Sequence, residues 1–378
     1  MKNHKEHIVW LPVIIIAIIN ALFTYKYGIR FSSHPFVLTI VYSILLVSIS
    51  FITKVILPKK YAGTILYIII AIYCLSDIYF IYATDPLKLN VDRWSVITSF
   101  WDCCFAGKYP YLAKSHMGNA PGPFPIYFLL ALPFYFMHQI GYFSLLGLVL
   151  MLIFIFRQKV DIRSKATVVF ISLASASVIW ELTTRSTILI NSCLILFYVW
   201  WLLNIKTFNT KNLIWAGIFG GLLLSTRGLA ILPLIIIYSK LFLKERKWKE
   251  VMIIGSALTI TFALTLLPFA LWDYSLFVKY NPFTLQEQHF LPGYVIAIVL
   301  LLCLGLGLSI KNRFNIYLYS GLMLFLTVAA YFVYMIITEG SAAFMSSRID
   351  ISYFIFSMPF LFAALLKGPD QDLAIENA

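Results

Sequence analysis

Apolar segments of about 20 residues recur along most of this chain, and they restrict its fold more than any other feature, because a helix of that length crosses a bilayer. Hydrophobic residues make up 61% of the 378 residues and charged residues only 12%, which excludes a soluble globular domain. We therefore predict an all-α polytopic membrane protein in which residues 1–378 form a single integral membrane domain. The predicted spans, about 12 within a range of about 10 to 13, cover residues 8–26, 36–56, 62–82, 141–156, 166–182, 186–204, 212–225, 228–243, 251–271, 294–310, 315–336 and 350–366.

The positions of Lys and Arg set the predicted orientation. A cytoplasmic N-terminus puts most of the 29 Lys and Arg residues in short inside loops, as the positive-inside rule requires, and makes residues 367–378 a cytoplasmic tail. The net charge of +13 is explained in this way, so no nucleic-acid partner is expected. We expect a multi-pass protein of the plasma (inner) membrane, with both termini in the cytoplasm and the lipid bilayer as a partner.

Two long polar loops, residues 83–140 and 272–293, fall on the extracytoplasmic side of this arrangement. From Asp92 to Phe105, polar and aromatic residues lie on opposite faces of a helical pattern, which predicts an amphipathic helix in the interface plane. Residues 123–138 are apolar but contain three prolines, so we predict an interfacial or re-entrant helix there instead of a span. The inside loops are short and basic, and the functional surface is therefore expected outside.

The first outside loop combines a carboxylate, aromatic rings and cations, a set that suits a sugar acceptor. Asp92 can take a proton from an acceptor hydroxyl as a general base. Tyr109 and Tyr111 can stack on sugar rings, while Arg and Lys side chains can hold a phosphate leaving group. The candidate cations of the outside face include Arg93, Lys108, Arg185, Arg227 and Arg348.

Simpler explanations exist for several of these residues. Asp92 can cap the helix that follows it, and the two tyrosines can belong to the aromatic belt of a membrane interface. Arg185 can form a local ion pair with Glu181, four residues before it. Arg227 lies between two short apolar segments, where a charge is costly without a partner or water, and this favours a function.

No metal or cofactor site is predicted. The five cysteines include no CxxC spacing, and single loop histidines such as His116 have no carboxylate at a ligand spacing. A divalent metal stays compatible with the loop but is not indicated.

The order of three short motifs resembles the glycosyltransferase C superfamily, and within it the bacterial mannosyltransferase-type members. An acidic residue in a large outside loop is followed by Gly107-Lys108-Tyr109-Pro110-Tyr111 and then by a proline-rich turn. The segments Leu222–Pro233 and Leu267–Asp273 complete the resemblance, which covers Asp92 to Asp273. It implies a hexosyltransferase that takes a sugar from a polyprenyl-phosphate donor and transfers it, with inversion, to a glycan or lipid acceptor in the cell envelope.

The resemblance also implies roles for individual residues. Asp92 would be the general base, Arg227 would face the carrier phosphate, and the tyrosine corner would shape the site. Here three predicted helices precede the loop, whereas the family has one, so Asp85 stays a second candidate for the base.

Two other classes of protein remain open. A lipid-linked polysaccharide polymerase of the O-antigen type would place its largest polar loop later, with arginines in it, but the loop 272–293 has only Lys279 as a cation. A transporter or flippase of lipid-linked sugars predicts inverted repeats and charges in the middle of spans, and no repeat is visible.

Overall fold

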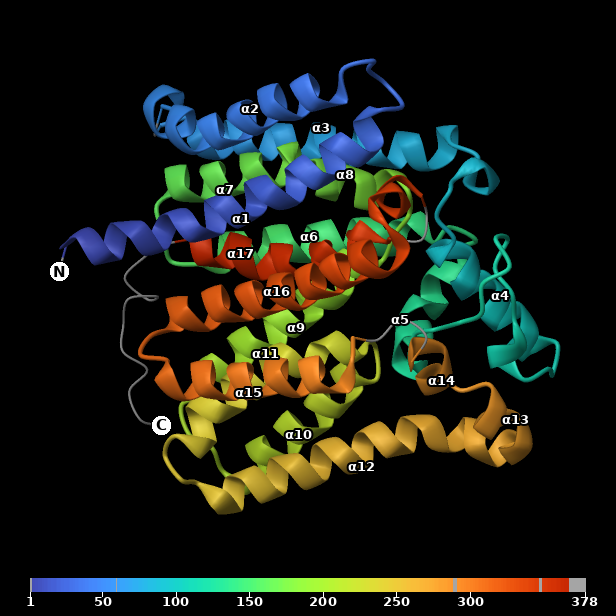
Figure 1. Ribbon diagram of the computed structural model, residues 1–378. Helices are drawn as coiled ribbons and strands as arrows, with labels where there is room; N and C mark the ends of the chain where they lie inside the picture. Colours follow the sequence, from blue (N-terminus) through green and yellow to red (C-terminus); the bar gives the residue numbers. More distant parts are fainter. Residues whose placement is uncertain (1, 59, 288–290, 347–348, 367–378) are drawn as a thin grey trace. The chain divides into compact units, whose positions relative to one another are not determined.

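The computed structural model describes residues 2–58, 60–287, 291–346 and 349–366. These residues form helices, turns and loops, and no strand occurs among them (Figure 1). The chain divides into two compact units. Unit 1 comprises the described parts of residues 1–83, 148–183 and 311–374, and unit 2 those of residues 84–147 and 184–310. The predicted tail 367–378 lies outside the described residues.

Unit 1 is built around the first helix, α1 (Lys2–Gly28), which packs against α2, α8 and α17. Helix starts and ends follow local signals: Pro35 opens α2, and Asn312 caps the last long helix by accepting a hydrogen bond from the Asn315 amide at 3.0 Å. Gly340, with a φ of 83°, ends that helix in a backbone conformation that glycine tolerates best. The further elements of unit 1 are α2 (Pro35–Ile56), α3 (Ala62–Ala83), α7 (Ile162–Ala174), α8 (Ala176–Thr183), α16 (Arg313–Glu339), η5 (Ser341–Met345), η6 (Ile351–Ser357) and α17 (Met358–Leu365).

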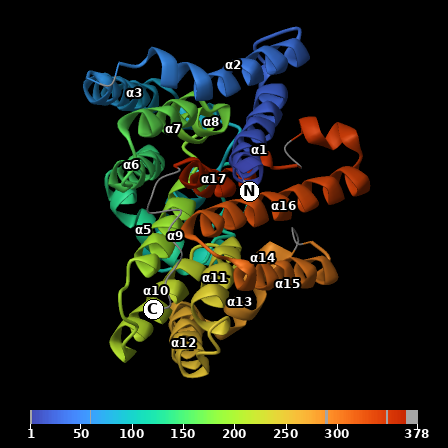
Figure 2. The same ribbon diagram turned by 90° about the vertical axis from the view of Figure 1, so that its left-hand side faces the viewer.

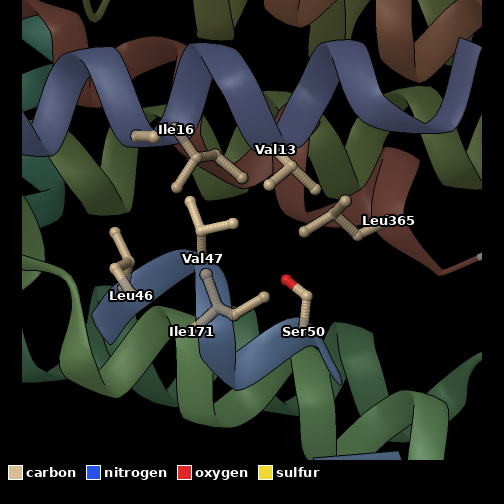
Figure 3. A pocket seen from close by; sticks show the side chains of 8 residues that line it. Val13, Ile16, Leu46, Val47, Ser50, Ile171 and Leu365 are labelled. Carbon is tan, nitrogen blue, oxygen red and sulfur yellow. The ribbon is translucent and has the colours of Figure 1, made fainter. Parts of the chain in front are cut away.

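The interior of unit 1 is apolar. Figure 3 shows a small pocket between α1, α2, α7 and the end of α17, lined by branched aliphatic side chains such as Ile16, Leu46 and Ile171. Figure 2 shows α7 and α8 beside α2 and α3, an arrangement that the contacts between these helices support.

Unit 2 contains the two predicted outside loops and the helices between them. Helix α10 lies unusually close to α12, because Gly217 and Gly221 have no side chain at the contact. A Cβ at Gly221 would come within 2.6 Å of the Leu258 carbonyl oxygen. The elements of unit 2 are η1 (Pro86–Lys88), α4 (Arg93–Phe105), η2 (Pro110–Leu112), α5 (Pro125–Phe136), α9 (Ile188–Leu203), α10 (Thr210–Leu224), η3 (Gly228–Ala230), α11 (Ile231–Tyr238), the π-helix η4 (Ser239–Leu243), α12 (Trp248–Trp272), α13 (Tyr274–Lys279), α14 (Pro282–Glu287) and α15 (Gly293–Ser309). Helix α6 (Gly141–Arg157) begins in unit 2 and continues in unit 1.

Five described helices are long and apolar enough to cross a membrane: Trp10–Gly28, Pro35–Thr53, Ala62–Ala83, Trp248–Trp272 and Arg313–Glu339. The bent pairs α5–α6 and α7–α8 raise the number to seven if each pair is one span. Only 6% of the apolar window of α12 and 11% of that of α2 is buried within the protein. Such outward apolar surfaces are compatible with contact to a lipid bilayer.

All of the predicted spans coincide with helical segments, but several are irregular. Residues 228–243 form a 3₁₀ turn, a short α-helix and a π-helix instead of one helix, and residues 350–366 begin as the 3₁₀-helix η6. The segment 166–182 is broken at Ser175, where α7 and α8 meet with a bend of 57°. The proline-rich segment 123–138 contains α5, which is bent by 113° from α6, as a broken span or a re-entrant loop would be.

Candidate functional site

Segments far apart in the sequence meet at one end of unit 2, around the N-termini of α4 and α5. The Phe124 amide donates to the Thr226 carbonyl oxygen at 3.3 Å, and the Ile126 amide donates to Ser225 at 3.0 Å. The end of α12 joins them, because Tyr109 packs edge-on against Trp272. Figure 1 shows α4, α5, α13 and α14 gathered near this end of α12. Both predicted outside loops of unit 2 therefore contribute to one site.

Asp92 is held by the loop that follows α4. Its Oδ2 atom accepts hydrogen bonds from the Ser115 hydroxyl at 2.6 Å and from the Asn119 side-chain amide at 2.7 Å. The half-buried Asp92 side chain makes no capping bond to α4, so the simple explanation as a helix cap is wrong. Its other oxygen, Oδ1, accepts no hydrogen bond from the described residues. One oxygen is thus held in place by two hydrogen bonds, and the other keeps its capacity to accept one.

A second set of contacts fixes the same loop to α4. The His116 Nδ1 atom lies 2.6 Å from the Ser95 hydroxyl, its Nε2 atom lies 3.2 Å from the Leu89 carbonyl oxygen, and its ring stacks on Trp94 at 5.2 Å. Ser95 is buried by these contacts, although the helical pattern places it on the polar face with Asp92.

Arg93, directly after Asp92, points into the protein. Only 9% of its surface is exposed, and its guanidinium donates a hydrogen bond to the Ser186 hydroxyl at 3.1 Å. The Ser186 carbonyl oxygen in turn accepts a hydrogen bond from Ser144 in α6. A buried cation is therefore fixed at the start of α4, in the residue that follows Asp92.

Arg227 approaches the same region from the turn between α10 and α11. Its guanidinium carbon lies 5.2 Å from the centre of the Tyr127 ring, a cation–π distance. The buried Tyr127 hydroxyl forms a hydrogen bond with Thr187, the N-cap residue of α9, and Arg93 also acts electrostatically on this phenol. Tyr127 therefore connects two of the predicted cations.

Arg185 adopts an uncommon backbone conformation beside this cluster. Its φ is 54°, in the left-handed region, which costs a non-glycine residue of order 1–3 kcal/mol. Its buried guanidinium donates a hydrogen bond to the Thr84 carbonyl oxygen at 2.7 Å. Burial lowers the pKa of Arg185, and the nearby Asp85 carboxylate opposes that shift. The strained turn thus holds a third arginine at the start of the first of the two loops that the sequence predicts to lie outside.

The two predicted tyrosines are buried, with exposures of 3% for Tyr109 and 1% for Tyr111, so they are not belt aromatics on an open surface. The Tyr111 hydroxyl donates a hydrogen bond to the Pro123 carbonyl oxygen at 3.2 Å, and the Tyr111 ring packs against Phe269 of α12. The Tyr109 hydroxyl has no hydrogen-bond partner among the described residues. Burial, with a smaller contribution from Asp273, raises the pKa of Tyr109 to about 12, so its phenol is a neutral donor.

The remaining predicted residues lie apart from this cluster. Lys108 is exposed, and Arg348 lies outside the described residues. Asp85 is exposed and caps η1 by accepting a hydrogen bond from the Leu87 amide at 3.0 Å. This local role makes it a weaker candidate for a base than Asp92.

Sequence reasoning missed the residues that connect the predicted ones: Ser115, Asn119, Tyr127, Ser186 and Thr187. A weak signal exists in the polar run Thr183–Thr187, which interrupts two apolar segments. Tyr127 lies in an apolar stretch and gives no signal of its own. Within the described part of the chain, no group of three or more His, Cys, Asp or Glu side chains is arranged to hold a metal ion.

No family model, curated protein or solved structure matches this chain in comparisons of its sequence and of its fold. The function therefore has to be inferred from the chemistry of the site and the order of its motifs.

Proposed function

We propose that this protein is a membrane glycosyltransferase that moves a sugar from a polyprenyl-phosphate donor to an extracytoplasmic acceptor, which is a glycolipid, a polysaccharide or a protein. The observation that supports the proposal most is the carboxylate of Asp92, which has one oxygen oriented by Ser115 and Asn119 and is followed in the chain by the fixed cation of Arg93. A base and a cation at adjacent positions are what displacement of a phosphate by a hydroxyl requires.

In the proposed reaction, Asp92 Oδ1 takes the proton of the acceptor hydroxyl as the acceptor oxygen bonds to the anomeric carbon of the sugar. The bond between that carbon and the phosphate oxygen breaks at the same time, and the configuration inverts. The electron pair leaves with the polyprenyl phosphate, whose growing negative charge Arg227 and Arg93 stabilise. The Tyr109 hydroxyl, which has no partner among the described residues, would donate a hydrogen bond to a sugar oxygen.

The topology belongs to the same proposal. The five shorter apolar helices also cross the bilayer, which gives about twelve crossings, cytoplasmic termini and an active site at the outer surface of the plasma membrane. The buried arginines would then lie at the level of the lipid headgroups, where a carrier phosphate is found.

Asp92→Asn tests the base, because the amide keeps the shape of the carboxylate and cannot take the proton. Loss of a general base lowers the rate by about 10²- to 10⁴-fold. The assay is mass spectrometry of polyprenyl-linked sugars and envelope glycans in a strain that lacks the protein, with each variant restored at equal membrane levels. We expect a single-sugar polyprenyl phosphate to accumulate without the protein and with Asp92→Asn. The control Asp85→Asn should restore the wild-type pattern.

The opposite result, restoration by Asp92→Asn but not by Asp85→Asn, would move the base to Asp85. Restoration by both variants would mean that neither carboxylate is the base.

One observation favours a transporter or flippase of lipid-linked sugars as the second candidate. Helices α7 and α8 in unit 1 form a discontinuous apolar pair, and broken helices are common at the binding sites of transporters. A deletion strain with unchanged sugar pools but altered movement of a lipid-linked sugar across the membrane would support this candidate over the transferase.

A further inference from the structure

A second carboxylate of interest belongs to unit 1. Asp77 lies six residues before the end of α3, on the inward-facing stripe that also contains Ala62, Leu66 and Ile81. Its side chain is only 5% exposed, while Leu75 on the opposite side of the helix is exposed. A helix of this kind normally has aliphatic residues along such a stripe, so an acid occupies a packing position.

The buried Oδ2 atom of Asp77 has no hydrogen-bond partner among the described residues. Its polar neighbours are Tyr73 and Cys74, one turn earlier on α3, with which it interacts electrostatically. Both neighbours are neutral groups. An ionised carboxylate that is buried without a partner costs several kcal/mol, whereas a neutral carboxylic acid does not carry that penalty.

Among the described residues, α7 and α8, which pack against α3, bring no positive charge to Asp77. On α7 the cations Arg163 and Lys165 lie in the first turn. The Lys165 ammonium donates to the Phe156 carbonyl oxygen at 2.8 Å, and Phe156 stacks on Tyr67 near the start of α3. Tyr67 precedes Asp77 by about ten residues on α3, so these cations lie roughly 15 Å along the helix from Asp77. The charged residue of α8 is Glu181, another acid.

The break between α7 and α8 lies beside α3 and is itself stabilised by side chains. The Tyr42 hydroxyl donates to the Ala174 carbonyl oxygen and accepts from the Ala176 amide, both at 2.7 Å. The Asn20 side chain accepts from the Ser177 amide at 3.0 Å. These bonds satisfy the backbone groups that the break exposes, so the break offers no free ligand that could hold a metal cation against Asp77.

We propose that Asp77 is a proton-binding site: its carboxyl group takes up a proton at mildly acidic pH, where exposed carboxylates stay ionised, and then lies as a neutral acid in the interior of unit 1. The ligand of the site is the proton itself. The proposal rests on the burial of Asp77, its missing partner and the absence of a nearby cation in the described structure, and it holds whether or not the protein transfers sugars.

Infrared difference spectroscopy tests the proposal on the full chain in lipid nanodiscs at pH 5. The spectrum of wild type minus Asp77→Asn should contain the carbonyl band of a protonated carboxylic acid. The matched control, wild type minus Asp85→Asn, should contain the bands of an ionised carboxylate, because Asp85 is exposed. Carboxylate bands in the Asp77 difference would overturn the proposal.

A second measurement needs no variant and guards against misfolding of Asp77→Asn. A membrane-permeant carbodiimide reacts with protonated carboxyl groups in apolar surroundings, and the labelled residue is identified by peptide mass spectrometry. We expect labelling of Asp77 to exceed that of the exposed Asp85 and Asp102 by at least about tenfold. Equal labelling of the three residues, or none at Asp77, would show that the buried proton is absent.

Discussion

The contact between α10 and α12 allows a substitution whose effect can be worked out from distances. A Cβ at Gly217 would lie 2.4 Å from the Cβ of Ala257 and 2.7 Å from the Ile254 carbonyl oxygen. Gly217→Ala must therefore push the two helix backbones apart. Overpacking of this kind costs about 1–3 kcal/mol, and the better helix propensity of alanine, about 1 kcal/mol, offsets only a part of that.

Gly255→Ala is the matched control, because Gly255 lies on α12 as well and a Cβ there meets no atom within 4 Å. This variant should keep the gain in helix propensity without the overlap. We expect the free energies of unfolding of the two variants to differ by about 1–3 kcal/mol, with Gly217→Ala the less stable. Thermal unfolding of both proteins in the same detergent measures the difference. Equal midpoints would refute the close approach of these helices.

Four further predictions concern single side chains. Asn119→Ala removes one hydrogen bond from Asp92 and should slow glycan formation less than Asp92→Asn does in the same mass-spectrometric assay. Tyr127→Phe removes the hydrogen bond to the N-cap of α9 and should lower the free energy of unfolding by about 1 kcal/mol, measured by thermal unfolding. Because the pKa of Tyr109 is raised from 10.0 to about 12, the folded state loses stability as the pH rises above 10, and Tyr109→Phe should reduce this alkaline loss in melting curves. Asp77→Leu replaces a buried acid that lacks a partner and should raise the free energy of unfolding by about 1–3 kcal/mol, which a higher melting temperature would show.

The positions of the helices could be predicted from the sequence, because a long apolar run can bury its backbone polar groups only as a helix in a membrane. The break between α7 and α8 at Ser175 could not be predicted in this way. Residues 166–182 contain no proline or glycine, and the broken backbone is stabilised by Tyr42 and Asn20, which come from other helices.

The candidate site was predictable in part. Asp92 and Arg93 stand out because charged residues are rare in such a chain, and the Gly-x-Tyr-Pro-Tyr corner marks the loop after them. The residues that orient them are common in loops and helices, so their identity alone says nothing. Ser115 and Asn119 matter because the loop folds back onto the start of α4.

By itself, the sequence determined the class of this protein: an all-helical chain whose apolar segments suit a bilayer and whose polar residues concentrate in a few loops. Local rules are sufficient for that, since apolar length and capping residues act within a single segment. Only the tertiary structure decided that Tyr127 connects Arg93 with Arg227, and that Asp77 is buried without a partner. These features depend on side chains that are distant in sequence, and their free energy comes from burial and electrostatic contacts that exist only once the helices pack.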